Sequence, residues 1–170
     1  MAGRFIKEAG VSSLKLEGGS PQLCDVVSRI TSAGIPLMGH IGILPQKILA
    51  TGNYRSRGSD EADAQDLMRE ALALEEAGAF AIVLEGIRSK IAGEITASLS
   101  IPTIGIGAGP DCSGQILVAQ DLLGLSDFSA QKRPKFVKNY ADLRAAVSKA
   151  VRAFIEEVRG GEYPDAKHSY

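Results

Sequence analysis

Short apolar runs and longer amphipathic stretches follow one another along the chain, which predicts strands and helices in regular succession. Apolar runs predict four strands, at residues 13–17, 35–40, 79–85 and 101–106, and residues 131–138 are a candidate for one more. Helical spacing and glycine stops predict helices at residues 22–32, 60–77, 89–99, 114–123 and 141–159. Strands that alternate with helices in this way predict an α/β fold with a parallel sheet and right-handed crossovers.

The chain contains an internal repeat in which each copy ends on a strand and a glutamate. Residues 8–18 (EAGVSSLKLEG) are echoed by residues 76–86 (EAGAFAIVLEG), and an Ile-Pro-x-x-Gly motif follows each copy. Parallel α/β folds build their sites at the carboxyl ends of strands, where both glutamates are expected. The repeat therefore predicts a site with paired carboxylates.

The start of the chain bears on the type of α/β fold. Residues 4–10 have the pattern of the last turns of a helix closed by Gly10, with no strand before them. A flavodoxin-like sheet would fit four or five strands, but a helix without a parent strand favours the C-terminal portion of a (βα)8 TIM barrel. That fold normally needs about 200 residues or more. We expect one partial barrel domain over residues 1–170, in which residues 160–170 form a polar C-terminal tail. Residues 41–59 are long for a strand-to-helix connection and predict a binding loop or lid.

Composition and charge narrow the class of partner. The chain has 170 residues, of which 45% are apolar and 23% charged, and this is typical of one globular domain. Its 19 basic and 20 acidic side chains give a net charge of -1, which argues against nucleic acid or an anionic membrane and favours a small-molecule partner.

Cys24 and Cys112 have neither a redox nor a zinc spacing, so we expect reduced thiols. The chain shows no membrane span and no targeting segment. We expect a soluble, cytoplasmic protein, or a mitochondrial one if the source is eukaryotic.

Four polar residues near the strand ends are candidates for chemistry. Alternate strands of a barrel contribute to the same layer, so Glu17 and Glu85 are expected to face one cavity, with His40 entering from the strand between them. Lys15 shares the Glu17 face of its strand, where its ammonium would bind an anionic substrate or form a Schiff base. Structural roles compete with these hypotheses. A glutamate can cap a helix or pair with a base, Lys15 can reach into solvent, and a lone histidine is often a structural hydrogen-bonding group.

A glycine-rich segment follows the fourth predicted strand. Residues 105–109 (GIGAG) suggest a dinucleotide motif, but the required G-x-G-x-x-G fails because residue 110 is proline. We therefore reject a dinucleotide site. The glycines allow either close approach of a ligand to the backbone or a tight turn, and the residues alone do not distinguish the two.

Several motifs fall together in order along the chain. They are KLEGG at 15–19, MGHIG at 38–42 with PQ at 45–46, LE at 84–85, IPTIGIGAG at 101–109 and PKF at 134–136. The set closely resembles the ketopantoate hydroxymethyltransferase family, also called 3-methyl-2-oxobutanoate hydroxymethyltransferase, over essentially the whole chain. The chain departs from the family pattern at residues 86–88 (GIR), where the family usually has Cys-x-Pro, and at Leu44, where it usually has Thr.

The resemblance implies a (βα)8 barrel of which this chain corresponds to the fourth strand onward. It implies that Lys15 and His40 bind substrate, that Glu17 is a carboxylate of a magnesium (Mg²⁺) site, and that Glu85 is the catalytic proton acceptor. Two aspartates that complete the family's metal site, and a serine that contacts substrate, have no counterpart in this sequence. The family is typically a homo-oligomer.

The resemblance also implies a reaction. In the family, Mg²⁺ chelated by a 2-oxo acid stabilises the enolate that forms when C3 loses its proton, and methylenetetrahydrofolate supplies the one-carbon unit. The product, 2-dehydropantoate, leads to pantothenate and coenzyme A. One alternative stays open: a catalytically incomplete family remnant that binds a partner or oligomerises through an open sheet edge. Another metal-dependent aldol or carbon-carbon lyase of the same barrel type would need a different acid pattern, and the paired Leu-Glu-Gly and the Gly-Ile-Gly-Ala-Gly segment disfavour it.

Overall fold

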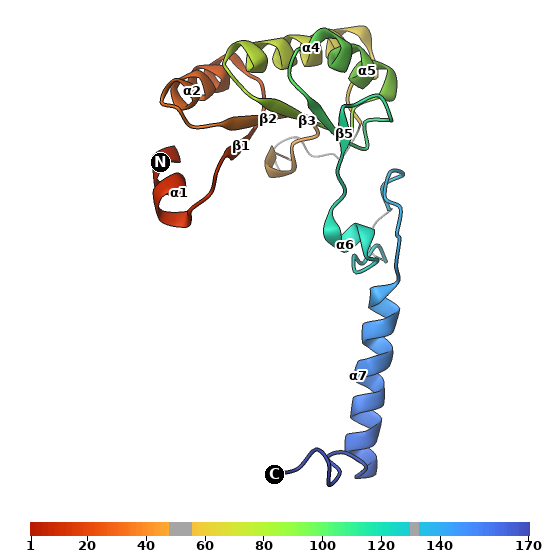
Figure 1. Ribbon diagram of the computed structural model, residues 1–170. Helices are drawn as coiled ribbons and strands as arrows, with labels where there is room; N and C mark the ends of the chain where they lie inside the picture. Colours follow the sequence, from red (N-terminus) through yellow and green to blue (C-terminus); the bar gives the residue numbers. More distant parts are fainter. Residues whose placement is uncertain (48–55, 130–132) are drawn as a thin grey trace. The chain divides into compact units, whose positions relative to one another are not determined.

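The computed structural model describes residues 1–47, 56–129 and 133–170 (Figure 1). The chain divides into two compact units, residues 1–116 and 117–170. The elements of the first unit are α1 (Ala2–Ala9), β1 (Leu14–Glu17), α2 (Pro21–Ser32), β2 (Leu37–Gly42), the 3-10 helix η1 (Pro45–Lys47), α4 (Glu61–Glu76), β3 (Ala81–Glu85), α5 (Ser89–Ser98), β4 (Thr103–Ile106) and β5 (Gly114–Gln115). The second unit contains α6 (Ala119–Leu122) and α7 (Leu143–Gly160). The expectation of one domain over residues 1–170 stays a prediction.

The five strands form one parallel sheet in the order β1-β2-β3-β4-β5. The α/β prediction is therefore confirmed, and the sequential order differs from the 2-1-3-4-5 order of flavodoxin-like sheets. Helices α2, α4 and α5 lie side by side on one face of the sheet (Figure 1). Sequential parallel strands with their helices on one face are the arrangement that part of a (βα)8 barrel would have.

The sequence repeat produces a structural repeat with the same register. Strand β1 pairs with β2 as β3 pairs with β4, so Glu17 lies opposite His40 and Glu85 lies opposite Ile106. Equivalent backbone hydrogen bonds begin and end each pair: Leu14 N to Pro36 O (3.0 Å) and Gly18 N to His40 O (2.7 Å), then Ile82 N to Pro102 O (3.1 Å) and Gly86 N to Ile106 O (2.9 Å). Each Ile-Pro motif thus supplies the acceptor that begins its strand pair, because the proline carbonyl remains available although proline lacks an N–H.

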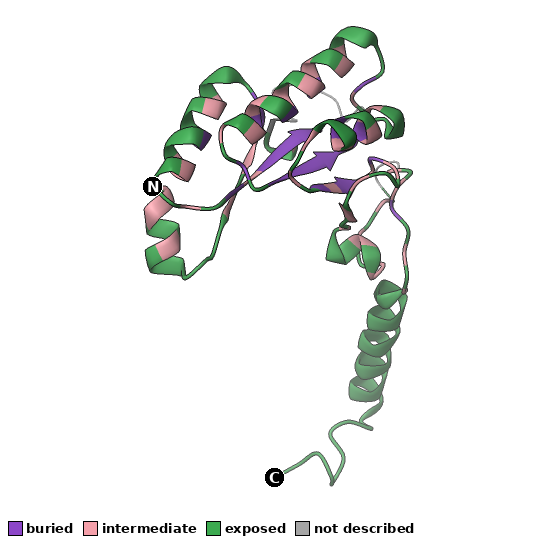
Figure 2. Ribbon diagram, turned by 45° about the horizontal axis from the view of Figure 1, so that its top comes forward, coloured by how far each residue is buried: buried purple, intermediate pink, exposed green. Residues whose placement is uncertain are grey.

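The core lies between the sheet and its helices. Asp60 caps α4 by accepting a hydrogen bond from Asp63 N, and the helix buries Leu67, Ala71 and Leu74 along one stripe, as the spacing predicts. Strand β3 is buried at every residue, which fits a continuous apolar run in a central parallel strand. Figure 2 shows the buried positions concentrated in the strands and on the inner faces of the helices.

Two secondary-structure predictions need correction. Residues 114–123 do not form one helix, because Gly114–Gln115 pair with the open edge of β4 and only Ala119–Leu122 are helical. Ile116 N continues the pairing by donating to Gly105 O (3.0 Å). A strand over residues 131–138 is also absent from its described part, residues 133–138, where Val137 N donates to Pro134 O (3.1 Å) in a turn. Residues 131 and 132 lie outside the described residues.

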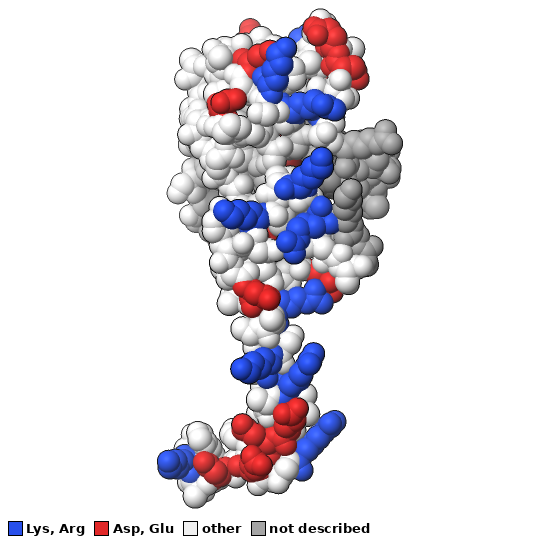
Figure 3. Space-filling view, turned by 90° about the vertical axis from the view of Figure 1, so that its right-hand side faces the viewer, with Lys and Arg blue, Asp and Glu red and all other residues white. Residues whose placement is uncertain are grey.

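The second unit is dominated by one long helix. Asp142 caps α7 by accepting from Ala145 N (3.1 Å), and Tyr163 packs edge-on against Phe154 with ring centroids 5.4 Å apart. Helix α7 buries no residue, and its apolar stripe, which includes Val147, Val151 and Val158, is exposed. Basic and acidic side chains both occur on the face shown in Figure 3. None of the helices in the described ranges is both long and apolar enough for a membrane crossing.

Candidate active site

Glu85 occupies the carboxyl end of the central strand β3. It is 8% exposed, and all four residues before it in the strand are buried. The regular strand ends here, where Gly86 adopts a left-handed φ of 59°. The carboxylate is thus held at the carboxyl edge of the sheet, where parallel α/β folds build their sites.

His40 lies between two carboxylates that come from different strands. Its Nε2 is 3.1 Å from Glu85 Oε2, and its Nδ1 is 3.8 Å from Glu17 Oε1. The imidazole is only 1% exposed, and neither ring nitrogen meets hydrogen-bond geometry with any partner in the described part of the chain. A buried imidazole with both nitrogens in this state has capacity to bond a ligand or to pass a proton between the flanking carboxylates.

Glu17 ends the edge strand β1 and is more accessible than Glu85. Its side chain is 13% exposed, and its Oε2 accepts a hydrogen bond from Gln46 N (3.3 Å) in η1. The sequence did not indicate this contact, because it depends on the path taken after β2. The chain therefore contributes a backbone donor to the site at Gln46, beside the side chains that the motifs suggested.

Lys15 stands apart from this group. It shares the Glu17 face of β1 by alternation and is exposed. Across the described residues, no hydrogen bond or ion pair joins its ammonium to Glu17 or His40. The structure thus brings together Glu17, His40 and Glu85, while Lys15 remains free to meet a ligand from solvent.

Two glycines shape the backbone around Glu85. Gly42 has a φ of 102°, and a Cβ there would lie 2.1 Å from Glu85 O, so only glycine allows the end of β2 to approach so closely. At Gly86 a Cβ would lie 2.3 Å from Ile43 Cδ1. Position 86 is one of the departures noted above, and a cysteine there would strain the left-handed backbone and require the Ile43 side chain to shift.

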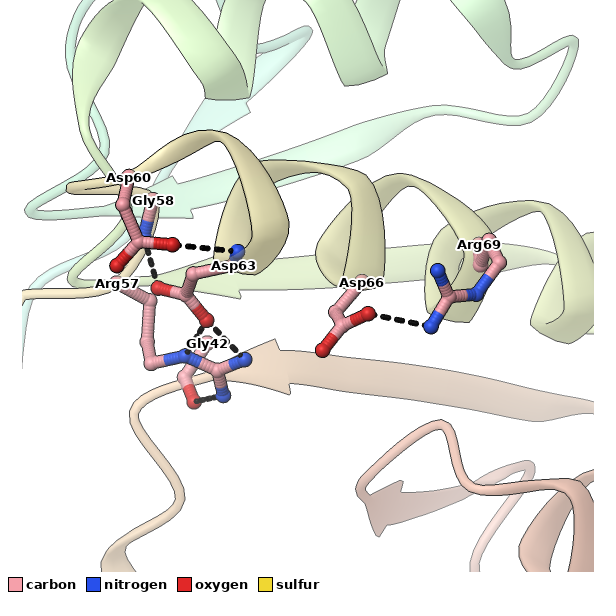
Figure 4. A network of polar contacts seen from close by, with 7 residues as sticks. All are labelled: Gly42, Arg57, Gly58, Asp60, Asp63, Asp66 and Arg69. Carbon is pink, nitrogen blue, oxygen red and sulfur yellow. Dashed lines mark hydrogen bonds and ion pairs between the residues drawn. The ribbon is translucent and has the colours of Figure 1, made fainter.

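A polar network that motif reasoning missed supports the same strand ends (Figure 4). Arg57 donates from Nε to Asp63 Oδ1 (2.6 Å) and from Nη1 to Gly42 O (3.5 Å), while Gly58 N also donates to Asp63. Burial opposes ionisation of Asp63, but the hydrogen bonds from Arg57 and Gly58 outweigh it and lower the pKa of Asp63. The only sequence signal was the Asp60-x-x-Asp63 spacing of a helix start.

The magnesium site implied by the resemblance is not complete within the described residues. They contain no group of three or more His, Cys, Asp or Glu side chains arranged to hold a metal ion. Mg²⁺ prefers six oxygen ligands in near-octahedral geometry, usually with one or two carboxylates among them. Glu17 and Glu85 are separated by an imidazole rather than converging, so these residues alone do not fit the ion.

Comparisons with known proteins place the chain in a family. The family model described as "Ketopantoate hydroxymethyltransferase" matches residues 1–166. The chain belongs to this family. It is 52% identical over 169 residues to a 3-methyl-2-oxobutanoate hydroxymethyltransferase of Geobacter sulfurreducens, covering 99% of this chain and 62% of that protein. It is 50% identical over 170 residues to the Chlorobaculum tepidum protein of the same name, covering 99% and 60%.

A relative from Acidothermus cellulolyticus with the same name is 53% identical over 167 residues, covering 98% of this chain and 60% of that protein. The chain thus spans about three fifths of the length of the curated relatives it matches. The motifs that suggested the ketopantoate hydroxymethyltransferase family from the sequence lie within this match, and the family prediction is confirmed.

Proposed function

We propose that residues 1–170 carry the proton-transfer part of a 3-methyl-2-oxobutanoate hydroxymethyltransferase, acting in pantothenate and coenzyme A biosynthesis. The observation that supports the proposal is the buried His40 set between Glu17 and Glu85 at the carboxyl edge of the sheet. Membership of the family supports a 2-oxo acid as the proposed substrate class, and we propose a folate as the co-substrate.

Glu85 is the proposed general base that removes the proton from C3 of the 2-oxo acid. A general base must lie within reach of the proton that it removes, and Glu85 stands at the carboxyl edge of the sheet, where parallel α/β folds build their sites. His40 Nε2, 3.1 Å from Glu85 Oε2, is close enough to orient the carboxylate as it takes the proton. The electron pair left at C3 delocalises into the keto group as an enolate.

His40, Glu17 and Lys15 have supporting roles in this proposal. His40 orients Glu85 and binds substrate through a ring nitrogen that has no partner within the described chain. The exposed Lys15 ammonium binds the substrate carboxylate, since a charge-assisted contact suits an anion that arrives from solvent. We prefer this to a Schiff base, because lysines that form one typically lie in desolvated pockets and Lys15 is exposed.

Glu17 is the proposed carboxylate ligand that this chain offers to Mg²⁺. The other protein ligands are not among the described residues, so we derive no step through the ion. Methylenetetrahydrofolate is the proposed one-carbon donor, and a homo-oligomer in the cytoplasm, or in mitochondria of a eukaryote, is the proposed setting. The full (βα)8 barrel is likewise a proposal.

Exchange of the C3 proton of 3-methyl-2-oxobutanoate with D2O tests the proposal without requiring folate. The test uses residues 1–170 joined to the part of the Geobacter sulfurreducens relative that they do not match. Glu85→Gln should slow the exchange by about 10²- to 10⁴-fold, because the variant keeps the shape of the side chain but lacks the base. Substrate binding, measured by calorimetry, should persist.

Glu17→Gln is the matched control, since it makes the same chemical change at the equivalent position of the repeat. Its defect should shrink as the Mg²⁺ concentration rises, whereas the Glu85→Gln defect should not. If Glu85→Gln exchanges the C3 proton at a rate within threefold of that of the unmodified protein, Glu85 is not the base. No exchange by the unmodified chimaera at any Mg²⁺ concentration would favour the non-catalytic alternative.

A further inference from the structure

We propose that Arg57 is a positioning residue that ties the carboxyl end of β2 to that of β3 and so fixes His40 against Glu85. This inference rests on the proposed function for its catalytic readout, whereas the tie itself consists of hydrogen bonds that can be tested without catalysis. Arg57 forms hydrogen bonds with Gly42, Gly86, Arg88 and Asp63, so its influence on His40 and Glu85 passes through the strands that carry them.

The backbone of Arg57 extends the end of β3. Arg57 N donates to Gly86 O (2.9 Å), and Arg88 N donates to Arg57 O (3.0 Å), which makes a parallel bridge opposite Ile87. Gly86 follows Glu85 directly. The chain segment that returns from the loop after β2 is therefore fastened one residue beyond the proposed base.

The side chain of Arg57 reaches the neighbouring strand. Its Nη1 donates to the carbonyl of Gly42, the last residue of β2, over 3.5 Å. Gly42 is the register partner of Glu85, and the next residue along, Ile43, donates its N–H to Glu85 O (2.8 Å). One residue thus holds β3 through its backbone and β2 through its guanidinium, on either side of the proposed base.

Asp63 holds the guanidinium in the orientation that this tie requires. It lies in the first turn of α4, where its carboxylate meets Arg57 Nε and Nη2 and also accepts from Gly58 N. The side chains of Arg57 and Asp63 are 33% and 22% exposed, so the pair is only partly screened by water. Burial acts against the charge on Arg57, but Asp63 outweighs it and raises the pKa of the guanidinium.

The tie matters because the His40–Glu85 contact crosses from β2 to β3. His40 lies two residues before Gly42 on β2, and its Nε2 is 3.1 Å from a Glu85 oxygen. A shift of either strand end would change this distance directly. Proton transfer depends steeply on such geometry, so a loosened tie should lower the catalytic rate more than substrate affinity.

The test compares Arg57→Met with Arg69→Met, a matched control. Arg69 forms an ion pair with Asp66 on the same helix, but its side chain is 72% exposed and remote from the strand ends (Figure 4). Three quantities are measured in the chimaera. The first is the rate of C3 proton exchange in the substrate, which gives kcat and KM. The others are the hydrogen-deuterium exchange rates of the Ile43 and Arg88 amides and the ¹⁵N chemical shifts of the His40 ring.

Arg57→Met should lower kcat about tenfold with KM changed less than threefold, and should speed amide exchange at Ile43 and Arg88 about tenfold. It should also shift the His40 ring signals. Arg69→Met should change none of these. Arg57→Lys keeps the positive charge but lacks the planar guanidinium with its several donors, so it should recover only part of kcat. If Arg57→Met folds poorly, Arg57→Lys takes its place in the comparison.

Each contrary result overturns a defined part of the proposal. A fall in kcat without faster amide exchange would mean that Arg57 acts directly on substrate, and faster amide exchange with unchanged kcat would mean that the tie does not position the base. A chimaera without any C3 exchange contradicts the proposed function instead. In that case unchanged amide and His40 signals in Arg57→Met would refute the tie itself, and changed ones would support it.

Discussion

The two copies of the sequence repeat fold alike but are packed differently. Both run from a helix end through a left-handed glycine, Gly10 or Gly78, into a strand that ends on glutamate. In the first copy the strand β1 lies at the sheet edge with no fully buried residue, and in the second the strand β3 is central and buried throughout. The local pattern therefore determines the element, while the neighbours determine its burial and its chemistry.

Equivalent positions in the two copies differ in how far their side chains are exposed. Val11 is 38% exposed, whereas its counterpart Ala79 is 3% exposed. Lys15 is exposed on the edge strand, and its counterpart in the second copy is Val83, which is 7% exposed. A lysine is tolerable only where its ammonium can reach water. Lys15 can thus stay solvated, whereas Val83 contributes to the buried strand that carries Glu85.

The largest expected effect is a difference in stability between alanine variants of the equivalent leucines in the two copies. Leu84→Ala should destabilise the protein by about 2–5 kcal/mol, because Leu84 is fully buried in the core and its loss leaves a cavity. Leu16 is only partly buried against the same core, so Leu16→Ala should cost about half as much or less. The measurement is the free energy of unfolding in urea, read for each variant against the unmodified chain. Equal losses would show that the edge position of β1 does not weaken its packing.

The sequence predicted which side chains lie together at the candidate site, but not the hydrogen bonds that hold the surrounding backbone in place. Glu17, His40 and Glu85 were expected to meet because strand ends on one edge of a parallel sheet converge, and the structure brings them together. Their roles remain predictions. The donor at Gln46 and the Arg57 tie were beyond reach, because both depend on how the connection after β2 folds back rather than on periodicity.

A second comparison uses the two glycines that end the preceding helices. Gly78 has a φ of 89°, and an added Cβ would lie 2.9 Å from Thr31 Oγ1, the group that donates to Ala77 O. Gly10 has a φ of 66° with no atom within 4 Å of such a Cβ. Gly78→Ala should therefore cost about 1–2 kcal/mol for the left-handed backbone and more for the displaced threonine. Gly10→Ala should cost less, because α1 buries no residue and can fray alone.

Thermal unfolding of the two alanine variants gives the measurement. A cost of 1 kcal/mol corresponds to a fall in Tm of about 2–4 °C for a chain of this size. Gly78→Ala should show at least that fall, and Gly10→Ala should stay close to the unmodified chain. A larger fall for Gly10→Ala would indicate that the first copy carries stabilising contacts comparable to those of the second.

Helices and strands were predicted best where apolar runs were long and flanked by glycine or proline. They were predicted worst where the apolar runs were short. The limits of β3 and α4 fall within about two residues of the expected ones because burial and caps act together there. Residues 114–118 carry β-branched Ile116 and Val118, which disfavour helix, yet Gly114 and Gln115 pair with β4 only because residues 107–113 lead the chain back to the edge of that strand. The path of such a short connection cannot be inferred from a hydrophobic period.

The smallest expected effect concerns an ion pair that only the first copy has. Arg4 donates to both oxygens of Glu8, at 2.8 and 3.0 Å, one turn apart on α1. The corresponding residues of the second copy are Leu72 and Glu76, which cannot form such a pair. The hydrogen bonds from Arg4 lower the pKa of Glu8 below its ordinary value of 4.5, with burial opposing only slightly. Both side chains are mostly exposed, so water and salt screen the attraction.

A lowered carboxyl pKa in the folded state means that the pair stabilises α1 above the ordinary pKa and that this contribution is lost as the pH falls through the lowered one. Arg4→Gln should therefore return the Glu8 pKa toward 4.5, as read from its carboxyl ¹³C shift, and 1 M salt should do nearly the same in the unmodified chain. Neither change should alter Tm at neutral pH measurably, because exposed pairs contribute little and α1 buries nothing. A clear loss of Tm would mean that α1 is held by its charge pair, and that the edge copy depends on electrostatics where the central copy depends on packing.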